Sequence, residues 1–170
     1  MTPSAIPPPG ILVRHEFRPG DVGRIVERHG TLYARENGFD VTFEAYVAGP
    51  LAKFALERTE RERFWIAERA PDGAFAGCIA IVATASADEA QLRWFLVDPV
   101  SRGTGLGKWL LADALAFTRE RGYRSIHLWT VSALPAAAHL YRTAGFARVE
   151  EKPGAWGTPV TEERYVLRFG

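Results

Sequence analysis

Cysteine is almost absent from this 170-residue chain, which contains a single one, Cys78. One cysteine can form neither an internal disulfide nor a cysteine-based zinc cage. The four histidines, at positions 15, 29, 127 and 139, are scattered along the sequence rather than clustered. We therefore expect no disulfide framework and no metal site.

A dominant charge and a long apolar run are also missing. Lys and Arg number 21 against 20 Asp and Glu, which leaves a net charge of +1 and no overall field to attract nucleic acid or an anionic membrane. The longest uncharged stretch in the middle of the chain, residues 73–87, is shorter than the ~20 apolar residues of a spanning helix. Residues 1–10 lack the basic start and apolar run of a signal peptide. We expect a cytoplasmic protein that binds neither nucleic acid nor membrane.

What is present is the composition of an ordinary globular protein, with 47% hydrophobic and 24% charged residues. The length matches one domain, since domains most often have ~100–200 residues. Four prolines fall within the first ten residues, and so many prolines disfavour both helix and strand pairing. The prediction is a Pro-rich mobile tail over residues 1–10 and a single domain over residues 11–170.

Hydrophobic periodicity predicts the secondary structure. Alternating or branched apolar runs predict strands over residues 11–17, 64–68, 75–83, 91–97, 125–131, 145–152 and 163–169, and helical spacing predicts helices over 21–36, 41–56, 106–121 and 135–143. We expect Asp21 to cap the first helix and Gly49-Pro50 to kink or break the second. A Gly/Pro-rich loop over 153–159 should join the last two strands. This order of elements predicts an α/β fold with a mixed sheet covered by helices.

Residues 102–108, Arg-Gly-Thr-Gly-Leu-Gly-Lys, lie between a predicted strand and a predicted helix. Closely spaced glycines let backbone N–H groups turn toward one point, where the helix adds its positive end. The segment predicts a cradle for a phosphate or pyrophosphate, with Arg102 and Lys108 at its rim. A P-loop is excluded because Arg102 and Trp109 stand where Gly and Ser or Thr are required. A dinucleotide fingerprint is weak because Lys108 replaces its third glycine, and a turn without a ligand remains the alternative.

Two segments resemble the signatures of the GNAT acyltransferase superfamily. Residues 97–107 resemble its acetyl-CoA loop, R/Q-x-x-G-x-G/A after a strand, and residues 137–146 resemble A-x-x-L/I-Y-x-x-x-G-F, with one helix and one strand between them. The resemblance extends over residues 11–169. Residues 21–45 together with Trp129-Thr130 also resemble GNAT modules that some bacterial proteins carry behind a MarR-type DNA-binding domain. Too few residues precede the first predicted strand for such a domain, so we expect none here.

The resemblance implies the GNAT fold, a mixed, mostly antiparallel central sheet split by a V-shaped gap between two parallel strands, 91–97 and 125–131, with helices on both faces. Acetyl-CoA is implied as co-substrate, without a metal. A bulge in the first of these strands would free main-chain groups, so that the N–H of Phe95 faces the thioester carbonyl and Val97 pairs with the pantetheine arm. The residues implied to hold the pyrophosphate are Arg102, Gly103, Thr104, Gly105, Leu106, Gly107 and Lys108.

The same resemblance implies that Tyr141 protonates or hydrogen-bonds the departing CoA thiolate. The alternative for Tyr141 is a helix aromatic packed on the sheet. Many members of the superfamily have an asparagine at the position of Leu134, and its contact to pantetheine is absent here or replaced by Ser132. Ala137, which opens the second signature, is also expected to contact the cofactor.

No residue pattern identifies the general base. Glu44 and Glu89 are the candidates, and ordered water is the alternative. His139 is adjacent in the helix to Tyr141 but should point elsewhere. His29, His127 and the core thiol of Cys78 are expected to be structural.

The implied function is an acyl-CoA-dependent N-acyltransferase that moves acetyl from acetyl-CoA to a primary amine by direct attack. The alternative is a non-catalytic acyl-CoA-sensing or partner-binding module that kept the cradle and lost turnover. Residues 22–56 and the loop 153–162 should build the site for a small-molecule or peptide amine. Within that loop, Trp156 either closes the acceptor pocket or covers the sheet end. A homodimer is compatible with the family, although no residue indicates one.

Overall fold

The computed structural model describes residues 6–170, which divide into two compact units. The first unit contains the N-terminal segment up to Glu16, Thr59–His127 and Arg168–Gly170, and the second contains Phe17–Arg58 and Leu128–Leu167. The predicted tail lies partly outside the described residues, because these start at position 6. Mobility of the tail stays a prediction. No helix in the described range is both long and apolar enough to cross a bilayer.

Seven strands form one hydrogen-bonded sheet in the order β1-β2-β3-β4-β5-β7-β6. Of the strand pairs described, β4–β5 is parallel and the others are antiparallel. The predicted mixed, mostly antiparallel α/β fold is therefore confirmed. The strands are β1 (Ile11–Arg14), β2 (Arg63–Arg69), β3 (Phe75–Ala83), β4 (Glu89–Val97), β5 (Ser125–Val131), β6 (Ala147–Ala155) and β7 (Pro159–Arg168), and the helices are α1 (Asp21–Asn37), α2 (Val41–Glu57), α3 (Leu106–Glu120) and α4 (Pro135–Thr143).

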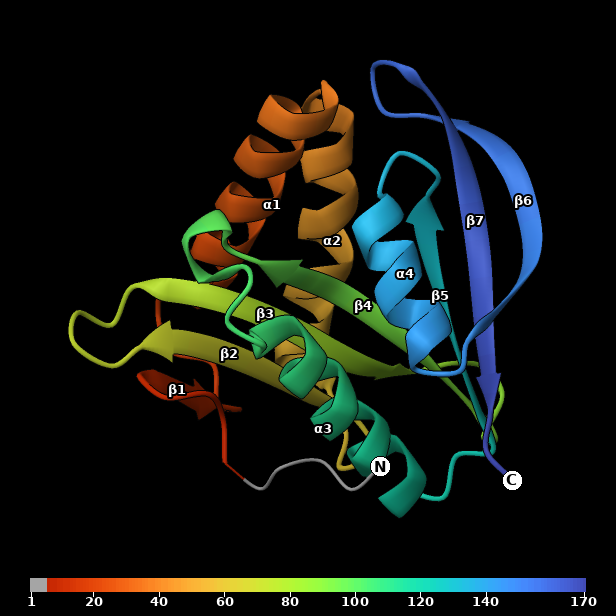
Figure 1. The fold of residues 1–170 in the computed structure, drawn as a ribbon, viewed down its shortest axis with the longest axis horizontal. Helices are drawn as coiled ribbons and strands as arrows, with labels where there is room; N and C mark the ends of the chain where they lie inside the picture. The colour runs from red at the N-terminus through yellow and green to blue at the C-terminus, as the bar shows by residue number, and fades with distance from the viewer. Residues whose placement is uncertain (1–5) are drawn as a thin grey trace. The chain divides into compact units, whose positions relative to one another are not determined.

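The first unit is built on β3, whose residues are buried from Phe75 to Ile81. Helix α3 packs on this strand (Figure 1). Gly77 sits at the contact, where a Cβ would come 2.8 Å from the Leu96 carbonyl and 3.5 Å from Leu106 and Leu110 of α3. A glycine is needed here because a Cβ would clash with the Leu96 carbonyl of β4, whereas the leucine side chains of α3 would be at ordinary contact distance.

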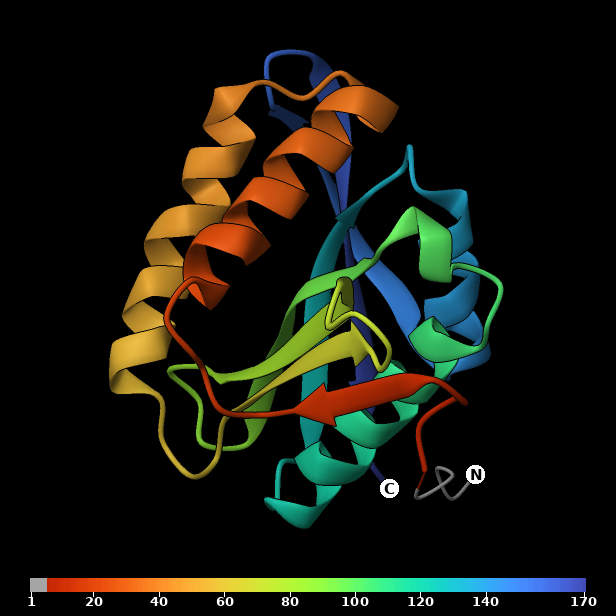
Figure 2. The ribbon, with the colours of Figure 1, turned by 90° about the vertical axis from the view of Figure 1, so that its left-hand side faces the viewer.

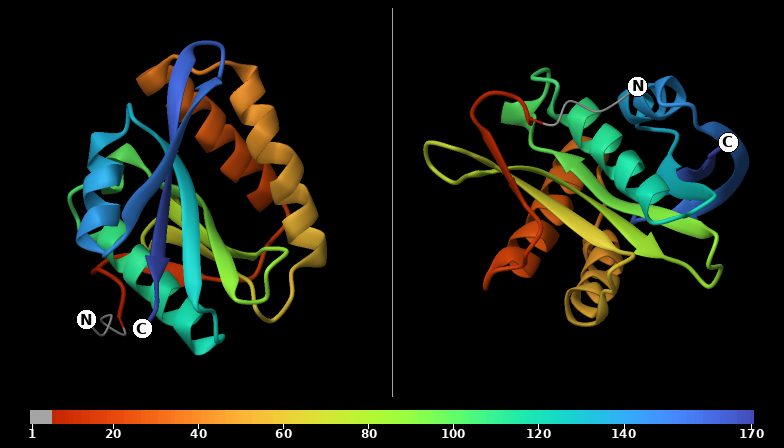
Figure 3. Two further views of the ribbon diagram at one scale, coloured as in Figure 1. Left: turned by 90° about the vertical axis from the view of Figure 1, so that its right-hand side faces the viewer. Right: turned by 90° about the horizontal axis from the view of Figure 1, so that it is seen from below.

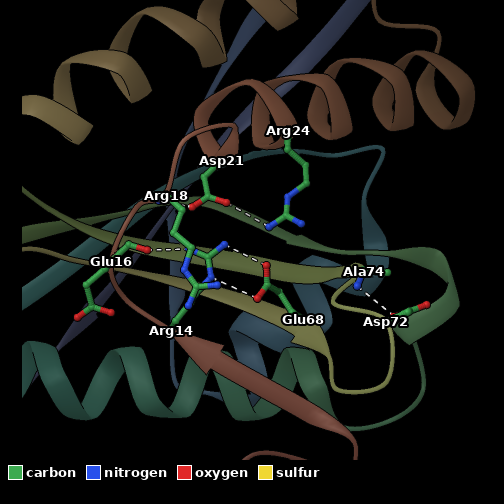
Figure 4. Close-up of polar contacts among 8 residues, drawn as sticks. All are labelled: Arg14, Glu16, Arg18, Asp21, Arg24, Glu68, Asp72 and Ala74. Carbon is green, nitrogen blue, oxygen red and sulfur yellow. Dashed lines mark hydrogen bonds and ion pairs between the residues drawn. The ribbon is translucent and has the colours of Figure 1, made fainter.

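A bidentate ion pair between Arg14 and Glu68 joins strand β1 to β2. Nε and Nη2 of Arg14 donate to the two carboxylate oxygens of Glu68 at 3.2 and 3.0 Å (Figure 4). Nη1 of Arg14 donates to the Glu16 carbonyl at 2.7 Å. That carbonyl is thus bonded to a side chain, and the strand ends at Arg14 rather than at the predicted residue 17.

In the second unit, α1 and α2 lie side by side (Figure 2). The prediction that Asp21 caps α1 is wrong, because Gly20 occupies the N-cap position and Asp21 is the first helical residue. The Asp21 carboxylate instead turns back, accepting the Arg18 N–H at 2.6 Å and Nη2 of Arg24 at 3.2 Å (Figure 4). These bonds fix the turn that leads into α1.

Helix α2 runs without interruption through Pro50, so the predicted break is wrong. Proline removes one intrahelical hydrogen bond. Val47, Leu51 and Phe54, which flank it, are all buried, and burying such side chains contributes roughly 1.5–3 kcal/mol each. That gain offsets the lost bond and keeps the helix continuous.

Strands β6 and β7 form a long hairpin in the second unit (Figure 3). The expected loop over 153–159 is mostly strand, since pairing continues to Gly154–Val160 and Ala155–Pro159. Proline is tolerated in β6 because β6 is an edge strand. Gly154 also has a local reason, because a Cβ there would come 2.7 Å from the Glu162 carboxylate.

Candidate active site

The loop between β4 and α3 is shaped by one cap and two glycines. Oδ1 of Asp98 accepts the Val100 N–H at 3.1 Å and so caps a short 3-10 helix, Pro99–Ser101. Gly103 and Gly105 have φ angles of 76° and 86°, which side-chain-bearing residues rarely adopt. A Cβ at either glycine would meet nothing within 4 Å. The backbone conformation, not lack of space, therefore requires glycine at both positions.

The amide groups of this loop are available to a ligand. The N-cap of α3, Gly105, provides no side-chain cap. Across the described chain, the N–H groups from Gly103 to Lys108 donate no hydrogen bond, and the first helical bond runs from the Trp109 N–H to the Gly105 carbonyl at 3.0 Å. Unpaired amides at a helix N-terminus favour a bound anion. Arg102 and Lys108 are exposed beside them, and the loop fits a diphosphate.

Strand β4 carries a bulge at the place that the resemblance implied. Cys78 pairs with Leu96 while Ala80 pairs with Arg93, so β4 holds one residue more than β3 across this interval. Trp94 lies in the bulge with a φ of 48°, which is uncommon for a bulky residue. A bulge redirects main-chain groups away from the ladder. Phe95, the expected oxyanion donor, follows immediately.

Three contacts hold the bulge in place. The Cys78 thiol donates to the Trp94 carbonyl at 3.0 Å. The Trp94 ring stacks against Phe64 at 6.0 Å, and the Arg93 guanidinium lies 4.8 Å from the same ring. Cys78 is completely buried, as expected of a core thiol, and it also bonds the one strained residue of β4.

The two ends of β4 carry different predicted residues. Val97 ends the strand, and its carbonyl lies 3.4 Å from Nε of Arg102. Glu89 begins the strand, with a carboxylate oxygen 3.3 Å from Nδ1 of His127 on β5. A strand rises about 3.3 Å per residue, which separates Glu89 from Phe95 by roughly 20 Å. The parallel ladder with β5 ends at Gln91, and the V-shaped gap beyond it stays a prediction.

In the second unit, Tyr141 is a buried phenol on α4. Its side chain packs edge-on against Phe146 at 5.9 Å and tilts against Tyr165 at 6.0 Å. Burial raises the pKa of the Tyr141 hydroxyl far above its ordinary value, and ionisation of Tyr33 at high pH would add to the rise. The hydroxyl therefore keeps its proton at neutral pH and can act as a donor.

A charged network orients α4 around Tyr141. Nη2 of Arg142 donates to the Tyr165 hydroxyl at 3.2 Å, and this hydroxyl donates to Glu163 at 3.1 Å. Nη1 of Arg148 donates to the other oxygen of Glu163 at 2.7 Å. Glu163 and Tyr165 are buried. The network ties α4 to both strands of the hairpin and limits the positions open to Tyr141.

The remaining predicted cofactor contacts lie on or just before α4. The Ser132 N–H donates to the Thr161 carbonyl at 2.9 Å, which leaves the exposed serine side chain as its contact group. Ala137 is half-buried in the first turn of α4. His139 is exposed, in agreement with the prediction that it points away from Tyr141.

Aromatic rings join α1, α2 and the tip of the hairpin. Phe43 lies 4.7 Å from Tyr33 and 5.5 Å from Trp156, and Tyr46 lies 4.7 Å from Trp156. The Asp40 N–H donates to the Trp156 carbonyl at 2.8 Å. Trp156 thus packs on the segment expected to bind the acceptor. We call the aromatic cluster the set Tyr33, Phe39, Phe43, Tyr46 and Trp156.

Glu44 lies beside this aromatic cluster on α2. Its carboxyl group packs against Gly30 of α1, where a Cβ would collide with it. Within the described part of the chain the carboxylate forms no hydrogen bond and no ion pair. The second unit therefore brings a half-buried, unpaired negative charge to the segment expected to bind an amine.

His29 on α1 is a residue whose chemistry the sequence did not reveal. It is 3% exposed, with Nδ1 2.8 Å from the Ile25 carbonyl, and Nε2 meets no hydrogen-bond partner within residues 6–170. Burial lowers the pKa of His29 from its ordinary 6.5 to about 4, against a smaller opposing effect of the Ile25 carbonyl. The imidazole is neutral at pH 7, and the carbonyl bond assigns its proton to Nδ1. The only signal in the sequence was its place one turn before Tyr33.

The amino-acid sequence of the chain is similar to those of known acetyltransferases. The model of the acetyltransferase (GNAT) family matches residues 27–146. An N-acetyltransferase of Schizosaccharomyces pombe is 28% identical over 121 residues, which are 69% of this chain and 72% of that protein. A mycothiol acetyltransferase of Cellulomonas flavigena is 48% identical over 52 residues, but these are 31% of this chain and 15% of that protein.

Solved structures share the fold. A GNAT-family acetyltransferase of Desulfovibrio desulfuricans superposes with a TM-score of 0.73 at 20% identity, covering 93% of this chain and 98% of that one. An acetyltransferase of Salmonella typhimurium, solved with acetyl-CoA, gives 0.73 at 17% identity and 94% of each chain. A spermidine N-acetyltransferase of Vibrio cholerae, in complex with CoA and spermine, gives 0.70 at 17% identity, with 94% and 95% covered.

The bulged strand and, among residues 6–170, the unpaired amides at the start of α3 are compatible with binding of an acyl-CoA. The family match over residues 27–146 gives the assignment: the chain belongs to the acetyltransferase (GNAT) family. Membership of this family makes it an acyl-CoA-dependent N-acyltransferase. Among residues 6–170, no group of three His, Cys, Asp or Glu side chains is arranged to hold a metal ion.

Proposed function

We propose that this acyltransferase moves acetyl from acetyl-CoA to a primary amine by direct attack, using the loop 102–108 as its coenzyme grip. The supporting observation is the row of N–H groups from Gly103 to Lys108 at the start of α3, which donate to no group of the described chain. Such amides, together with the positive end of a helix, suit a diphosphate. The exposed side chains of Arg102 and Lys108 add positive charge at the rim.

The pantetheine arm and the thioester use the neighbouring strand. Val97 pairs with pantetheine as an additional strand would, and the Phe95 N–H points at the thioester oxygen. A fixed donor at a developing oxyanion contributes about 2.7–4 kcal/mol in enzymes from which one was removed. Ser132 and Ala137 supply further contacts to the arm.

The chemical step forms one bond and breaks another. The amine nitrogen attacks the thioester carbon, the oxygen gains negative charge beside the Phe95 N–H, and the C–S bond then breaks. Tyr141 gives its proton to the departing thiolate. Glu44 and Glu89 remain the carboxylate candidates for the base, and Glu89 is disfavoured by its place at the far end of β4.

The acceptor is a small-molecule or peptide amine bound by residues 22–56 and 153–162, with Trp156 closing the site against α2. One relative is a mycothiol acetyltransferase and another is a spermidine N-acetyltransferase, so neither identifies the acceptor of this chain. We also propose a cytoplasmic location without nucleic-acid or membrane partners, which is supported by the acyl-CoA donor and by the net charge of +1. We also propose that the protein can form a homodimer and that it is related to the GNAT modules found fused to MarR-type regulators.

The test combines binding with turnover. We expect calorimetry to show binding of CoA, and thiol release to show acetylation within a panel of phenethylamine, spermidine and a lysine-containing peptide. Binding of CoA without consumption of acetyl-CoA by any amine would indicate the acyl-CoA-sensing alternative. Absence of any CoA binding would refute the proposed role of the loop.

Replacing the Tyr141 hydroxyl tests the acid directly. Tyr141→Phe should lower kcat by ~10²-fold, because proton transfer by a positioned side chain contributes at least that much, and should leave CoA affinity unchanged. Tyr123→Phe is the matched control, since the Tyr123 hydroxyl only donates to the Arg61 carbonyl at 3.2 Å. Equal kcat values in the Tyr141→Phe and unmodified proteins would remove Tyr141 from the mechanism.

A further inference from the structure

Three arginines near the C-terminal end of α3 have no carboxylate partner in the described chain. They are Arg61, Arg63 and Arg121, here called the arginine cluster, and all lie in the first unit. Within residues 6–170, the guanidinium groups of Arg63 and Arg121 form no hydrogen bond and no ion pair. Arg61 uses only Nη2, which donates to the Ala87 carbonyl at 2.8 Å and lies 3.4 Å from the Arg121 carbonyl. Arg121 is exposed and the other two are half-buried, so the cluster is open to solvent.

Buried aromatic rings hold these guanidinium groups in place. The Cζ atoms of Arg63 and Arg121 lie 4.2 and 5.0 Å from the centre of the Phe117 ring. Cζ of Arg61 lies 4.1 Å from the centre of the Tyr123 ring. Both rings are buried and therefore offer fixed surfaces for the cations. A guanidinium that lies over a ring still has N–H groups along its edge, which can form two parallel bonds to one anion.

The cluster concentrates positive charge. Because Arg63 and Arg121 lie over the same ring, their Cζ atoms are within about 9 Å of each other, less than the Debye length of ~10 Å at about 0.1 M salt. Glu62 does not neutralise them, since its two carboxylate oxygens accept the backbone N–H groups of Thr59 and Ala83 at 2.8 and 3.0 Å. A bound anion would relieve the repulsion between the cations.

We propose that the arginine cluster is a second anion site, which binds the phosphate group of a small molecule. A phosphate monoester carries a charge of about −1.5 to −2 at pH 7 and has three strong acceptor oxygens. It can therefore accept bonds from more than one guanidinium, and arginine pairs with phosphate in a bidentate geometry. A carboxylate carries a single charge, which one arginine already balances.

This site is separate from the loop 102–108, which is proposed to hold the diphosphate of CoA. The loop precedes α3 and Arg121 follows it, so the two sites lie at opposite ends of this helix (Figure 1). The helix has 15 residues, and a rise of 1.5 Å per residue separates its ends by roughly 20 Å. Phosphate binding at the cluster therefore does not depend on the proposed acyl transfer.

Calorimetry on the full chain tests the site. Inorganic phosphate is titrated without CoA and with one equivalent of CoA, which separates binding at the loop 102–108 from binding at the cluster. Arg63→Gln and Arg121→Gln each remove one guanidinium from the cluster. The matched control is Arg119→Gln, which removes the same charge from the last turn of α3, where Arg119 lies 4.7 Å from the ring of Phe169. Thermal melting reports whether each variant folds.

We expect phosphate to bind in the presence of CoA, at least ~10-fold more weakly in both cluster variants because a charge-assisted bond is lost, and unchanged in Arg119→Gln. Ribose 5-phosphate serves as a second probe. Tighter binding of ribose 5-phosphate than of inorganic phosphate would support a phosphate monoester as the ligand, and weaker binding would support the free ion.

Several results would overturn the assignment. One is the absence of phosphate binding in the presence of CoA, and another is equal affinity in the unmodified protein and the cluster variants. Acetate bound as tightly as phosphate would indicate a carboxylate site instead, and binding of a DNA duplex without binding of phosphate would indicate a nucleic-acid surface. If Arg63→Gln does not fold because Phe117 loses its cover, Arg121→Gln decides alone, since Arg121 is exposed.

Discussion

The loop 102–108 and helix α1 differ in which groups they leave without hydrogen bonds: backbone amides in the loop, and a side-chain nitrogen in the helix. In the loop, the amides from Gly103 to Lys108 have no partner within residues 6–170, while the side chains of the loop are mostly exposed. In α1 the backbone bonds are satisfied by the helix, and a side-chain atom, Nε2 of His29, has no hydrogen-bond partner among residues 6–170. A main-chain site needs a particular conformation, whereas a side-chain site needs a particular residue. Substitutions in the two regions should therefore fail in different ways.

The largest effect should come from removing one main-chain donor. Phe95→Pro deletes the N–H beside the bulge and should lower kcat by ~10²–10³-fold, the effect of losing an oxyanion donor. Phe95→Ala removes the ring but keeps the N–H, and should retain most of the activity. Steady-state kinetics with CoA calorimetry as the folding check would measure this. Equal losses in the two variants would mean that the side chain, not the backbone, acts.

A large pH effect on stability should arise from His29. The unfolded chain binds a proton at this residue below pH 6.5, whereas the folded chain does so only below about 4. Stability should therefore fall as the pH drops from 6.5 to 4, by up to about 3 kcal/mol. Urea unfolding across this interval measures the fall, and His29→Phe should remove that part of it. An identical pH dependence in both proteins would contradict burial of a neutral imidazole.

A smaller loss is expected at the loop glycines. Gly105→Ala forces a side chain into a φ of 86° and should cost about 1–2 kcal/mol, together with weaker CoA binding. Gly49→Ala in α2 is the control, because Gly49 has no positive φ and an added Cβ meets nothing within 4 Å. It should stabilise the helix by roughly 0.5–1 kcal/mol. Calorimetry with CoA should show weaker binding for Gly105→Ala and unchanged binding for Gly49→Ala. Equal affinities in the two variants would contradict the prediction.

The smallest effect should be at Cys78. Cys78→Ala removes the donor to the Trp94 carbonyl and should cost about 1 kcal/mol or somewhat more in stability, with a few-fold loss of kcat as the bulge relaxes. Cys78→Ser keeps a hydroxyl donor and should preserve kcat better than Cys78→Ala. Chemical unfolding and kinetics of both variants measure this. A kcat for Cys78→Ser below that of Cys78→Ala would show that the hydrogen bond does not support the bulge.

Most of the fold could be predicted from the sequence, because the spacing of apolar residues reflects which face of each helix or strand is buried. The strand 125–131 and the helix 135–143 have the predicted bounds. The errors occurred where tertiary contacts overrode local preference, as at Pro50, which buried neighbours hold inside a helix, and at Gly154, which pairing keeps inside a strand.

The candidate site was predictable where it depends on glycine spacing and not where it depends on packing. The loop 102–108 can be recognised in the sequence by its glycines, which tolerate a positive φ angle. His29 gives no such sign, because nothing in its sequence neighbourhood tells a satisfied imidazole from an unsatisfied one. Only the packing of α1 within the second unit shows that Nε2 has no partner among the residues that the structure describes.

The unpaired amides of the loop also bear on how this enzyme can drift during evolution. Every residue except proline carries the same N–H, so Arg102, Thr104 and Lys108 can change without erasing the grip on a diphosphate. Only Gly103 and Gly105 are constrained, by their φ angles. Affinity for the donor can thus be inherited almost unaltered while other segments diverge, which leaves acceptor choice as the trait most open to selection.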